Sequence, residues 1–161
     1  MGKLILTLCC FLSLTIGASP PVSNPHADAA PVPDHALDRY GNICWEDEKA
    51  RLDNFAIHTQ NNPDRLGYIV VYAGRRSCAG EVRVRAERAR KWVVEKRGVD
   101  ADRVVWRDGG YREEVTTEFW LLPRDLNEKD WPMAPTLERK EVKVFSRCKG
   151  EIYRPAKCDN P

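Results

Sequence analysis

Two stretches of the chain place apolar residues at the spacing of a helix face. They are residues 48–59, with Leu52, Phe55, Ala56 and Thr59, and residues 81–96, with Val82, Ala86, Ala89 and Val93. Residues spaced i, i+3, i+4 and i+7 lie on one side of a helix. The pattern therefore predicts two amphipathic helices, the first capped by Asp47 and the second closed by Gly98.

Strand-like runs alternate with these helices. Residues 68–72 are β-branched and aromatic, which is typical of a central strand, and residues 103–106 form a similar run. Residues 115–122 follow the turn signal Asp108–Gly110, which favours an antiparallel hairpin with the preceding strand. Residues 35–40 are a candidate first strand and residues 141–145 a candidate fifth.

The resulting order is β-α-β-α-β-β. Strands joined through a helix pair in parallel by right-handed crossovers, whereas the last two strands are expected to pair antiparallel. The sequence therefore predicts an α/β domain over residues 35–123, built as a two-layer sandwich of helices on a mixed sheet.

The first part of the chain, residues 1–18, has the features of an export signal. Lys3 precedes the apolar run Leu4–Ile16, and small residues follow at Gly17–Ser19. The run is shorter than the ~20 residues that a membrane-spanning helix needs. We therefore expect cleavage after Ala18 and no transmembrane span in the mature protein, which is periplasmic, associated with the outer membrane, or secreted.

Two further segments flank the predicted domain. Residues 19–34 are rich in proline and lack apolar periodicity, which is typical of an extended tether. Residues 124–161 form a C-terminal extension that carries Cys148 and Cys158. The domain organisation predicted from the sequence is therefore signal, tether, α/β domain and extension.

Composition and charge narrow the class of protein. The chain has 161 residues, of which 42% are hydrophobic and 31% charged, and its net charge is only +2. These values are typical of one globular domain and exclude a wholly disordered chain or a multi-span membrane protein. The small net charge indicates no particular partner.

Four cysteines remain after signal removal: Cys44, Cys78, Cys148 and Cys158. In an exported chain, four cysteines predict two disulfides, for which three pairings exist. The loops after the first and second strands of parallel units open at the same end of the sheet. We therefore expect Cys44–Cys78, which leaves Cys148–Cys158.

Part of the predicted domain resembles the OmpA-like C-terminal domain, over about residues 37–122. The resemblance is carried by the element order and by Glu48–Ala56, Gly67–Val71, Arg85-Ala86, Trp92-Val93, Arg97-Gly98-Val99 and Asp102-Arg103-Val104. Asp47–Ala56 together with Asp108–Glu113 is also similar to a group of exported bacterial proteins to which no reaction is assigned. The resemblance implies the OmpA-like fold and a role in the cell envelope.

The OmpA-like family binds the diaminopimelate of peptidoglycan through an Asp after the second strand and an Arg early in the second helix. Arg85 matches that Arg by its place in the Arg-Ala pair, but residues 72–80 hold no Asp. Arg75 and Arg76 stand in this loop, and they would repel the ammonium of a zwitterion. The resemblance thus implies a ligand site at Arg75, Arg76 and Arg85, with little affinity for free diaminopimelate.

Between Arg75 and Arg112 the chain carries twice as many basic residues as acidic ones. Positive side chains in a loop that leads into a helix N-terminus favour an anion such as a carboxylate or phosphate. A solvated helix face balanced by acids elsewhere is the other interpretation of the same charge run. Because the apolar stripe of the second helix is expected to face the sheet, Arg83, Arg88, Arg90 and Lys91 are expected to lie in water.

No catalytic or metal-binding pattern stands out. Cys78 with His58 as a base is a candidate nucleophile, but an exported cysteine is more often part of a disulfide. Asp38 and Glu48 are a candidate carboxylate pair in a chain with many acids. Cys148 and Cys158 lack the spacing of a zinc site. We therefore expect no enzyme activity, no cofactor and no metal.

Three functions remain open. The first is a non-catalytic exported domain that binds an anionic cell-envelope component, such as peptidoglycan or another anionic envelope polymer. The second is a structural or protein-interaction domain that meets an envelope protein and does not bind peptidoglycan. The third is a hydrolase of unknown type. Nucleic acid is not expected as a partner, because export removes most contact with it.

Overall fold

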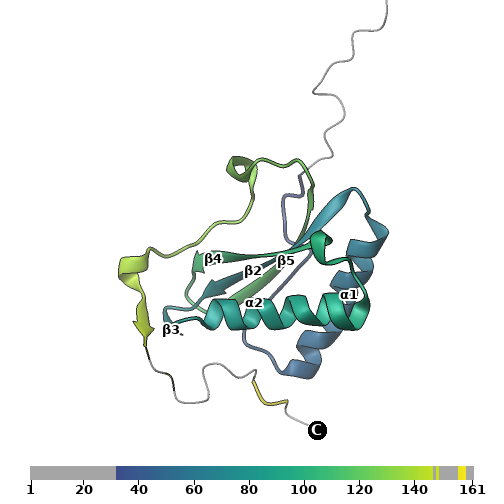
Figure 1. Ribbon diagram of the computed structural model, residues 1–161. Helices are drawn as coiled ribbons and strands as arrows, with labels where there is room; N and C mark the ends of the chain where they lie inside the picture. The colour runs from purple at the N-terminus through teal and green to yellow at the C-terminus, as the bar shows by residue number, and fades with distance from the viewer. Residues whose placement is uncertain (1–31, 147, 149–155, 159–161) are drawn as a thin grey trace, which may run out of the picture.

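The computed structural model describes residues 32–146, 148 and 156–158 (Figure 1). The predicted export signal and most of the tether lie outside these residues. The two long helices are α1 (Trp45–Asn61) and α2 (Glu81–Lys91), and α2 continues into one π-helical turn, η1 (Trp92–Lys96). The other helical elements of the described residues are three short 3-10 turns, η2 (Ala101–Arg103), η3 (Glu128–Asp130) and η4 (Arg139–Glu141).

The strands form one four-stranded and one two-stranded sheet. They are β1 (Asp38–Tyr40), β2 (Arg65–Ala73), β3 (Arg76–Cys78), β4 (Val104–Tyr111), β5 (Thr116–Pro123) and β6 (Lys143–Phe145). The larger sheet has the order β1-β5-β2-β4, and β3 pairs with β6 in the smaller one. Strand β2 is parallel to β4 and antiparallel to β5, which is itself antiparallel to β1. The predicted α/β class and mixed sheet are therefore confirmed.

The prediction of a hairpin between the strands at residues 103–106 and 115–122 is wrong. Strand β2 lies between β4 and β5, so the two do not pair with one another. The Asp108–Gly110 segment is not a turn but part of β4, where a register shift places Val71 beside Asp108 and Ala73 beside Tyr111. Gly110, with φ +85°, supplies the backbone conformation that this bulge needs. The first strand likewise pairs with β5 and not in parallel with β2.

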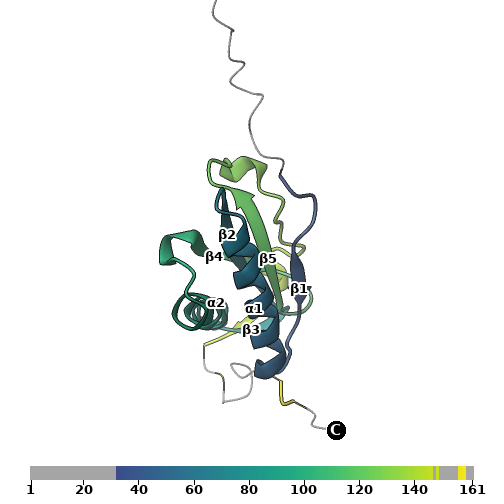
Figure 2. The same cartoon turned by 90° about the vertical axis from the view of Figure 1, so that its right-hand side faces the viewer.

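The two helices cover one face of the larger sheet. Strand residues Ile69, Val71 and Phe119 share a buried cluster with Leu52 and Phe55 of α1 and with Val82, Ala86, Ala89 and Val93 of α2. Both predicted helical stripes therefore face the sheet, as expected. In Figure 2, α2 lies at one side of the molecule and β1 at the other, in agreement with the strand order.

Close packing of α1 on the sheet depends on Gly67 in β2. A Cβ at this position would lie 2.7 Å from Cζ of Phe55 and 2.8 Å from Oγ1 of Thr59. Phe55 in turn stacks on Phe119 of β5, with ring centroids 4.6 Å apart. The absence of a side chain at Gly67 lets the helix approach the sheet at this point.

The opposite face of the sheet is covered by the chain after β5. Tyr68, Val70, Tyr72, Trp120 and Leu122 form a second buried cluster, against which Leu126, Trp131 and Met133 pack. Part of the predicted extension thus contributes to the core.

Helix α1 begins three residues before the predicted start, and Cys44, not Asp47, is at the capping position. Glu46, Asp47 and Glu48 lie in its first turn, where negative side chains stabilise a helix, and so favour this start.

The structure contains two disulfides, Cys44–Cys158 and Cys78–Cys148, with Cα atoms 5.0 and 6.0 Å apart. The prediction that all four cysteines are paired is confirmed, and the predicted pairing is wrong. The sequence gives no strand signal at β3, which pairs in parallel with β6 and so brings Cys148 beside Cys78. A bridge between Cys44 and Ala156 does the same for Cys158. Among the described residues, no helix is long and apolar enough to cross a membrane.

Candidate functional site

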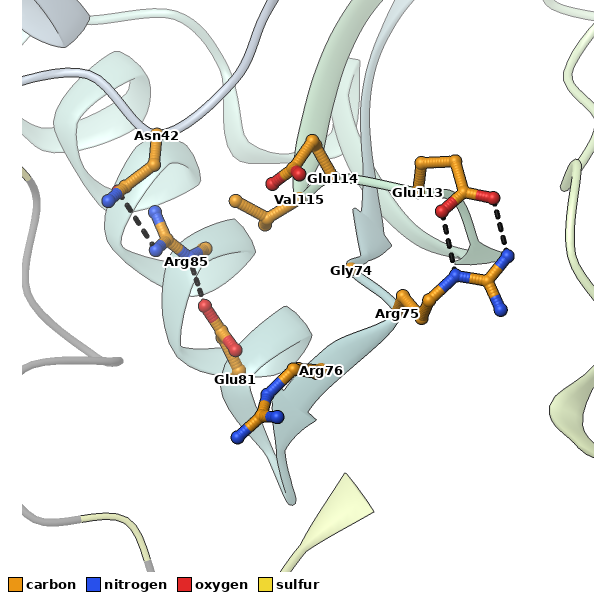
Figure 3. Close-up of a pocket in the computed structure, with 9 residues that line it drawn as sticks. All are labelled: Asn42, Gly74, Arg75, Arg76, Glu81, Arg85, Glu113, Glu114 and Val115. Carbon is orange, nitrogen blue, oxygen red and sulfur yellow. Dashed lines mark hydrogen bonds and ion pairs between the residues drawn. The ribbon is translucent and has the colours of Figure 1, made fainter. Parts of the chain in front are cut away.

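A pocket of about 470 Å³ lies at the carboxyl ends of β1 and β2, which run in the same direction on either side of β5. Asn42 follows β1, Gly74 and Arg75 follow β2, and residues 113–115 connect β4 to β5. The first turns of α2 complete the wall with Glu81 and Arg85 (Figure 3). In open α/β sheets, ligands often bind in crevices at the carboxyl ends of the strands, so this pocket is the candidate site.

The structure brings together all three residues that the sequence indicates as ligand-binding. Arg75, Arg76 and Arg85 line this one pocket. Arg75 lies between β2 and β3, Arg76 is the first residue of β3, and Arg85 comes from α2. Gly80, at the capping position of α2 with φ +82°, lets the chain turn sharply from β3 into the helix, which returns Arg85 to the loop.

Arg85 lies in the wall that α2 contributes to the pocket, and it is only 6% exposed. Its Nε donates to Oε1 of Glu81 at 3.0 Å, and its Nη2 donates to Oδ1 of Asn42 at 3.0 Å (Figure 3). Glu81 is 3% exposed and also accepts from the backbone N–H of Cys78 at 3.2 Å. The guanidinium is therefore held in a fixed position by groups from α2 and from the loop after β1.

Arg75 makes a two-pronged ion pair on the other side of the pocket. Its Nε and Nη2 donate to the two carboxylate oxygens of Glu113, at 2.7 and 2.5 Å (Figure 3). This hydrogen bonding and the charge of Glu113 raise the pKa of Arg75, and Arg75 lowers the pKa of Glu113. The pair is exposed, so it orders the two side chains more than it stabilises the fold.

The pocket carries a balanced set of charges. Its lining includes three arginines and three glutamates, and Glu113 and Glu114 are not among the residues that the sequence predicts for the site. Within the described residues, neither Arg76 nor Glu114 has a charged side-chain partner, and both are exposed. Figure 3 shows the Glu114 carboxylate turned toward the side of the pocket where Arg85 lies.

A buried polar network lies below the pocket, between α1 and α2. Glu48 of α1 is 3% exposed, and it accepts from Nη2 of Arg88 at 2.5 Å and from the hydroxyl of Tyr40 at 3.3 Å. Burial raises the pKa of Glu48, against the charges of Arg88 and Arg85. Burial and the Glu48 charge also hold the pKa of Tyr40 well above its ordinary value. This network ties β1 and both helices together under the site.

The helix face predicted to lie in water is only partly so. Arg83 and Lys91 are exposed as expected, but Arg88 and Arg90 are half-buried. Arg88 pairs with Glu48, and Arg90 donates to the carbonyl oxygens of Val104 and Ala101, at 2.8 and 2.5 Å. These two arginines have partners within the fold, because long side chains of α2 reach over the edge of the sheet and across to α1.

The residues considered for catalysis have structural partners. Cys78 is in a disulfide, Asp38 accepts from Nη1 of Arg51 at 2.7 Å, and Glu48 is part of the network below the pocket. His58 lines a different part of the surface, beside Leu37. In the part of the chain that the structure describes, no group of His, Cys, Asp or Glu side chains is arranged to hold a metal ion.

Comparisons with known proteins return no match for this chain, neither among family models nor among curated proteins or solved structures.

Proposed function

We propose that this protein is a non-catalytic exported domain of the divergent OmpA-like type, which binds an anionic cell-envelope polymer at the pocket between β1, β2 and α2. The observation that carries the proposal is the convergence of Arg75, Arg76 and Arg85 on this pocket at the carboxyl ends of the strands. The resemblance to the OmpA-like domain, with Arg85 in the place of the ligand-binding Arg, supports it independently.

The three arginines contribute differently to the proposed site. Arg76 is exposed, without a carboxylate partner in the described residues, and so is available to pair with a carboxylate or phosphate of the polymer. Arg85 provides a guanidinium in a fixed position in the α2 wall, since Glu81 and Asn42 hold it. Arg75 is held by Glu113 and shapes the wall.

The carboxylate of Glu114 limits which anionic ligands can bind in the pocket. An unpaired carboxylate at the rim repels a purely anionic ligand, but it accepts a hydrogen bond from a hydroxyl or amide and attracts an ammonium. For an anionic polymer we therefore expect weak binding that fades with salt, because exposed charges are screened over about 8 Å at physiological ionic strength.

The test is a sedimentation assay of the purified protein with sacculi at low and high salt. Arg76→Ala should weaken binding severalfold, whereas Lys96→Ala should leave it unchanged, because Lys96 lies at the far end of the α2–η1 helix. Both side chains are exposed, and the guanidinium of Arg76 also lies 5.4 Å from the ring centre of Phe145, so circular dichroism of the Arg76 variant accompanies the binding assay. Equal binding by the two variants would contradict the proposal.

Glu114→Gln separates two ligand classes. Removal of its charge should strengthen binding of a purely anionic polymer and weaken binding of a ligand that carries an ammonium. Free diaminopimelate is the second probe, and salt-resistant binding of it would show that the site recognises a zwitterion. An absence of binding to sacculi, with retention of an envelope protein, would favour the alternative function of a protein-interaction domain.

Export is part of the proposal. The two disulfides fit an oxidising compartment, which supports the signal predicted at residues 1–18. Amino-terminal sequencing of protein recovered from the envelope or the medium should begin at or near Ser19. An intact Met1 on that protein would contradict export by this signal.

A further inference from the structure

Strand β4 is an edge of the larger sheet. It pairs with β2 on one side, and within the described residues no other strand pairs along its opposite side. Two contacts close the ends of this free side. Nε of Arg90 donates to the carbonyl oxygen of Val104, and the carbonyl oxygen of Tyr111 accepts from the N–H groups of Thr136 and Leu137. Between these ends the edge is open.

The direction of the backbone groups along β4 follows from the register. The N–H of Leu37 donates to the carbonyl oxygen of Phe119, so the backbone groups of Phe119 point from β5 toward β1. Successive residues of a strand point their backbone groups to opposite sides, so those of Glu118 and Trp120 point toward β2. In β2, the backbone groups of their partners Val70 and Tyr68 therefore point toward β5. The backbone groups of Ile69 and Val71 point the other way, toward β4.

Ile69 lies beside Trp106 and Val71 beside Asp108, and in a parallel pair a residue bonds to the neighbours of its partner. The backbone groups of Trp106 and Asp108 thus point away from β2. The bond from Arg90 to Val104, two residues earlier, agrees with this direction. Among the described residues, no hydrogen bond fills these four groups of Trp106 and Asp108.

A second pocket, of about 240 Å³, adjoins this open edge on the helix side. Trp106, Asp108 and Tyr111 of β4 form one wall, and Val82 of α2 and Val144 of β6 contribute apolar surface opposite. Its size suits a single aliphatic or aromatic side chain. Strands that are added to a sheet edge gain affinity from backbone bonds and specificity from pockets for alternate side chains.

From this combination we infer that the β4 edge binds an extended peptide of a partner protein. The peptide pairs with Trp106 and Asp108 through its backbone, and one of its apolar side chains enters the pocket beside Val82. This inference is independent of the polymer site, which lies at the ends of β1 and β2.

The charges along the edge indicate the composition of the peptide. Arg83 lines the pocket and is exposed, without a carboxylate partner in the described part of the chain. Arg107, also exposed, lies 3.6 Å from Glu128, a pair that an incoming carboxylate can replace. Asp108 uses its carboxylate to accept from the N–H of Gly110. The partner is therefore an acidic peptide with an apolar residue at its centre.

A proline tests the edge without disturbing the sheet. Asp108→Pro removes an outward N–H while the bonds to β2 are kept, since proline is tolerated where the N–H of an edge strand faces solvent. Asp108→Ala is the matched control, because it also loses the bond to Gly110 but keeps the N–H. Circular dichroism and thermal unfolding of both variants establish that they are folded.

The probe is a displayed library of random twelve-residue peptides, selected on the oxidised protein. Selected peptides should alternate apolar and acidic residues, shift the amide resonances of Trp106 and Asp108, and bind Asp108→Pro at least about fivefold more weakly than Asp108→Ala, as expected for one lost hydrogen bond. A selection without binders, or with binders insensitive to Asp108→Pro, would overturn the inference. A dimer dispersed by Asp108→Pro would also overturn it, with a second copy as the occupant.

Discussion

Arg85 and Glu81, one turn apart on α2, form an ion pair in which both side chains are more than nine-tenths buried. Such a pair stabilises a fold little by itself, but removal of one partner leaves a buried charge uncompensated. Arg85 is therefore a poor residue for a binding test by simple truncation. Loss of binding in Arg85→Ala would reflect the state of the fold as much as the loss of a ligand contact.

We expect Arg85→Ala to lower the free energy of unfolding by about 3–5 kcal/mol, because Glu81 stays buried beside the N–H of Cys78. Arg76→Ala should change it by no more than about 1 kcal/mol, since Arg76 is exposed and its contact with the ring of Phe145 is a cation–π interaction at the surface. Urea denaturation of the two variants measures the difference. Equal midpoints would mean that the guanidinium of Arg85 is solvated and not paired.

The disulfides give a second prediction. Non-reducing peptide mapping should link Cys78 to Cys148 and Cys44 to Cys158. The Cys78–Cys148 bond spans 70 positions, for which the chain-entropy model gives about 4 kcal/mol. The double change Cys78→Ser with Cys148→Ser should therefore lower the thermal midpoint and expose the amides of β6 to hydrogen exchange. Unchanged protection of β6 would show that its pairing with β3 does not need the disulfide.

The error in the disulfide pairing shows where the sequence is uninformative. Periodicity identified both helices and the central strand, because these elements bury one face or two faces against the core and so carry a regular apolar pattern. Strand β3 has the sequence Arg-Ser-Cys, which has no such pattern. It is a strand only because β6, distant in the chain, pairs with it. No local signal could have placed Cys148 beside Cys78.

The arginines of the candidate site could be predicted from the sequence, and the glutamates Glu113 and Glu114 could not. Arg85 was found through the Arg-Ala pair, and Arg75 and Arg76 through the loop before α2. Glu113 and Glu114 reach the pocket only because the chain passes over the end of β2 between β4 and β5. The glycine pair near the end of β4 predicts a hairpin turn, and a hairpin would leave this connection away from the end of β2.

A third prediction concerns Glu118, which is fully buried in β5. It accepts from Arg39, Arg112, the hydroxyl of Tyr72 and Nε1 of Trp120, at 2.6, 2.7, 3.1 and 3.1 Å. Burial opposes its ionisation, but the hydrogen bond and charge of Arg112, with smaller effects of Trp120 and Arg39, hold its pKa below the ordinary 4.5. Burial and the Glu118 charge together raise the pKa of Tyr72 to about 12.

Because the pKa of Glu118 is lower in the folded than in the unfolded chain, its contribution to stability is present above pH 4.5 and is lost as the pH falls through the folded value. Glu118→Gln should therefore lower the free energy of unfolding at pH 7, by about 3 kcal/mol for lost bonds to charged partners. The difference from the unchanged protein should shrink in acid. Urea denaturation at a series of pH values measures it, and a difference independent of pH would show that the carboxylate is not ionised in the fold.

The last prediction concerns the face of α2 that packs on the sheet. Ala89 is 1% exposed and lies among Ile69, Val104 and the other apolar residues of the helix-side cluster. Ala89→Asp would bury a carboxylate without a partner, at a cost of about 4 kcal/mol.

Arg83→Ala, on the exposed face, is the control and should change stability by less than about 0.5 kcal/mol. Arg90→Ala is not a suitable control, because its guanidinium binds the carbonyl oxygens of Val104 and Ala101, and its loss should cost about 1 kcal/mol. Thermal unfolding should therefore rank the variants Ala89→Asp, Arg90→Ala and Arg83→Ala in order of decreasing destabilisation. Equal shifts for Ala89→Asp and Arg83→Ala would mean that α2 presents a different face to the sheet.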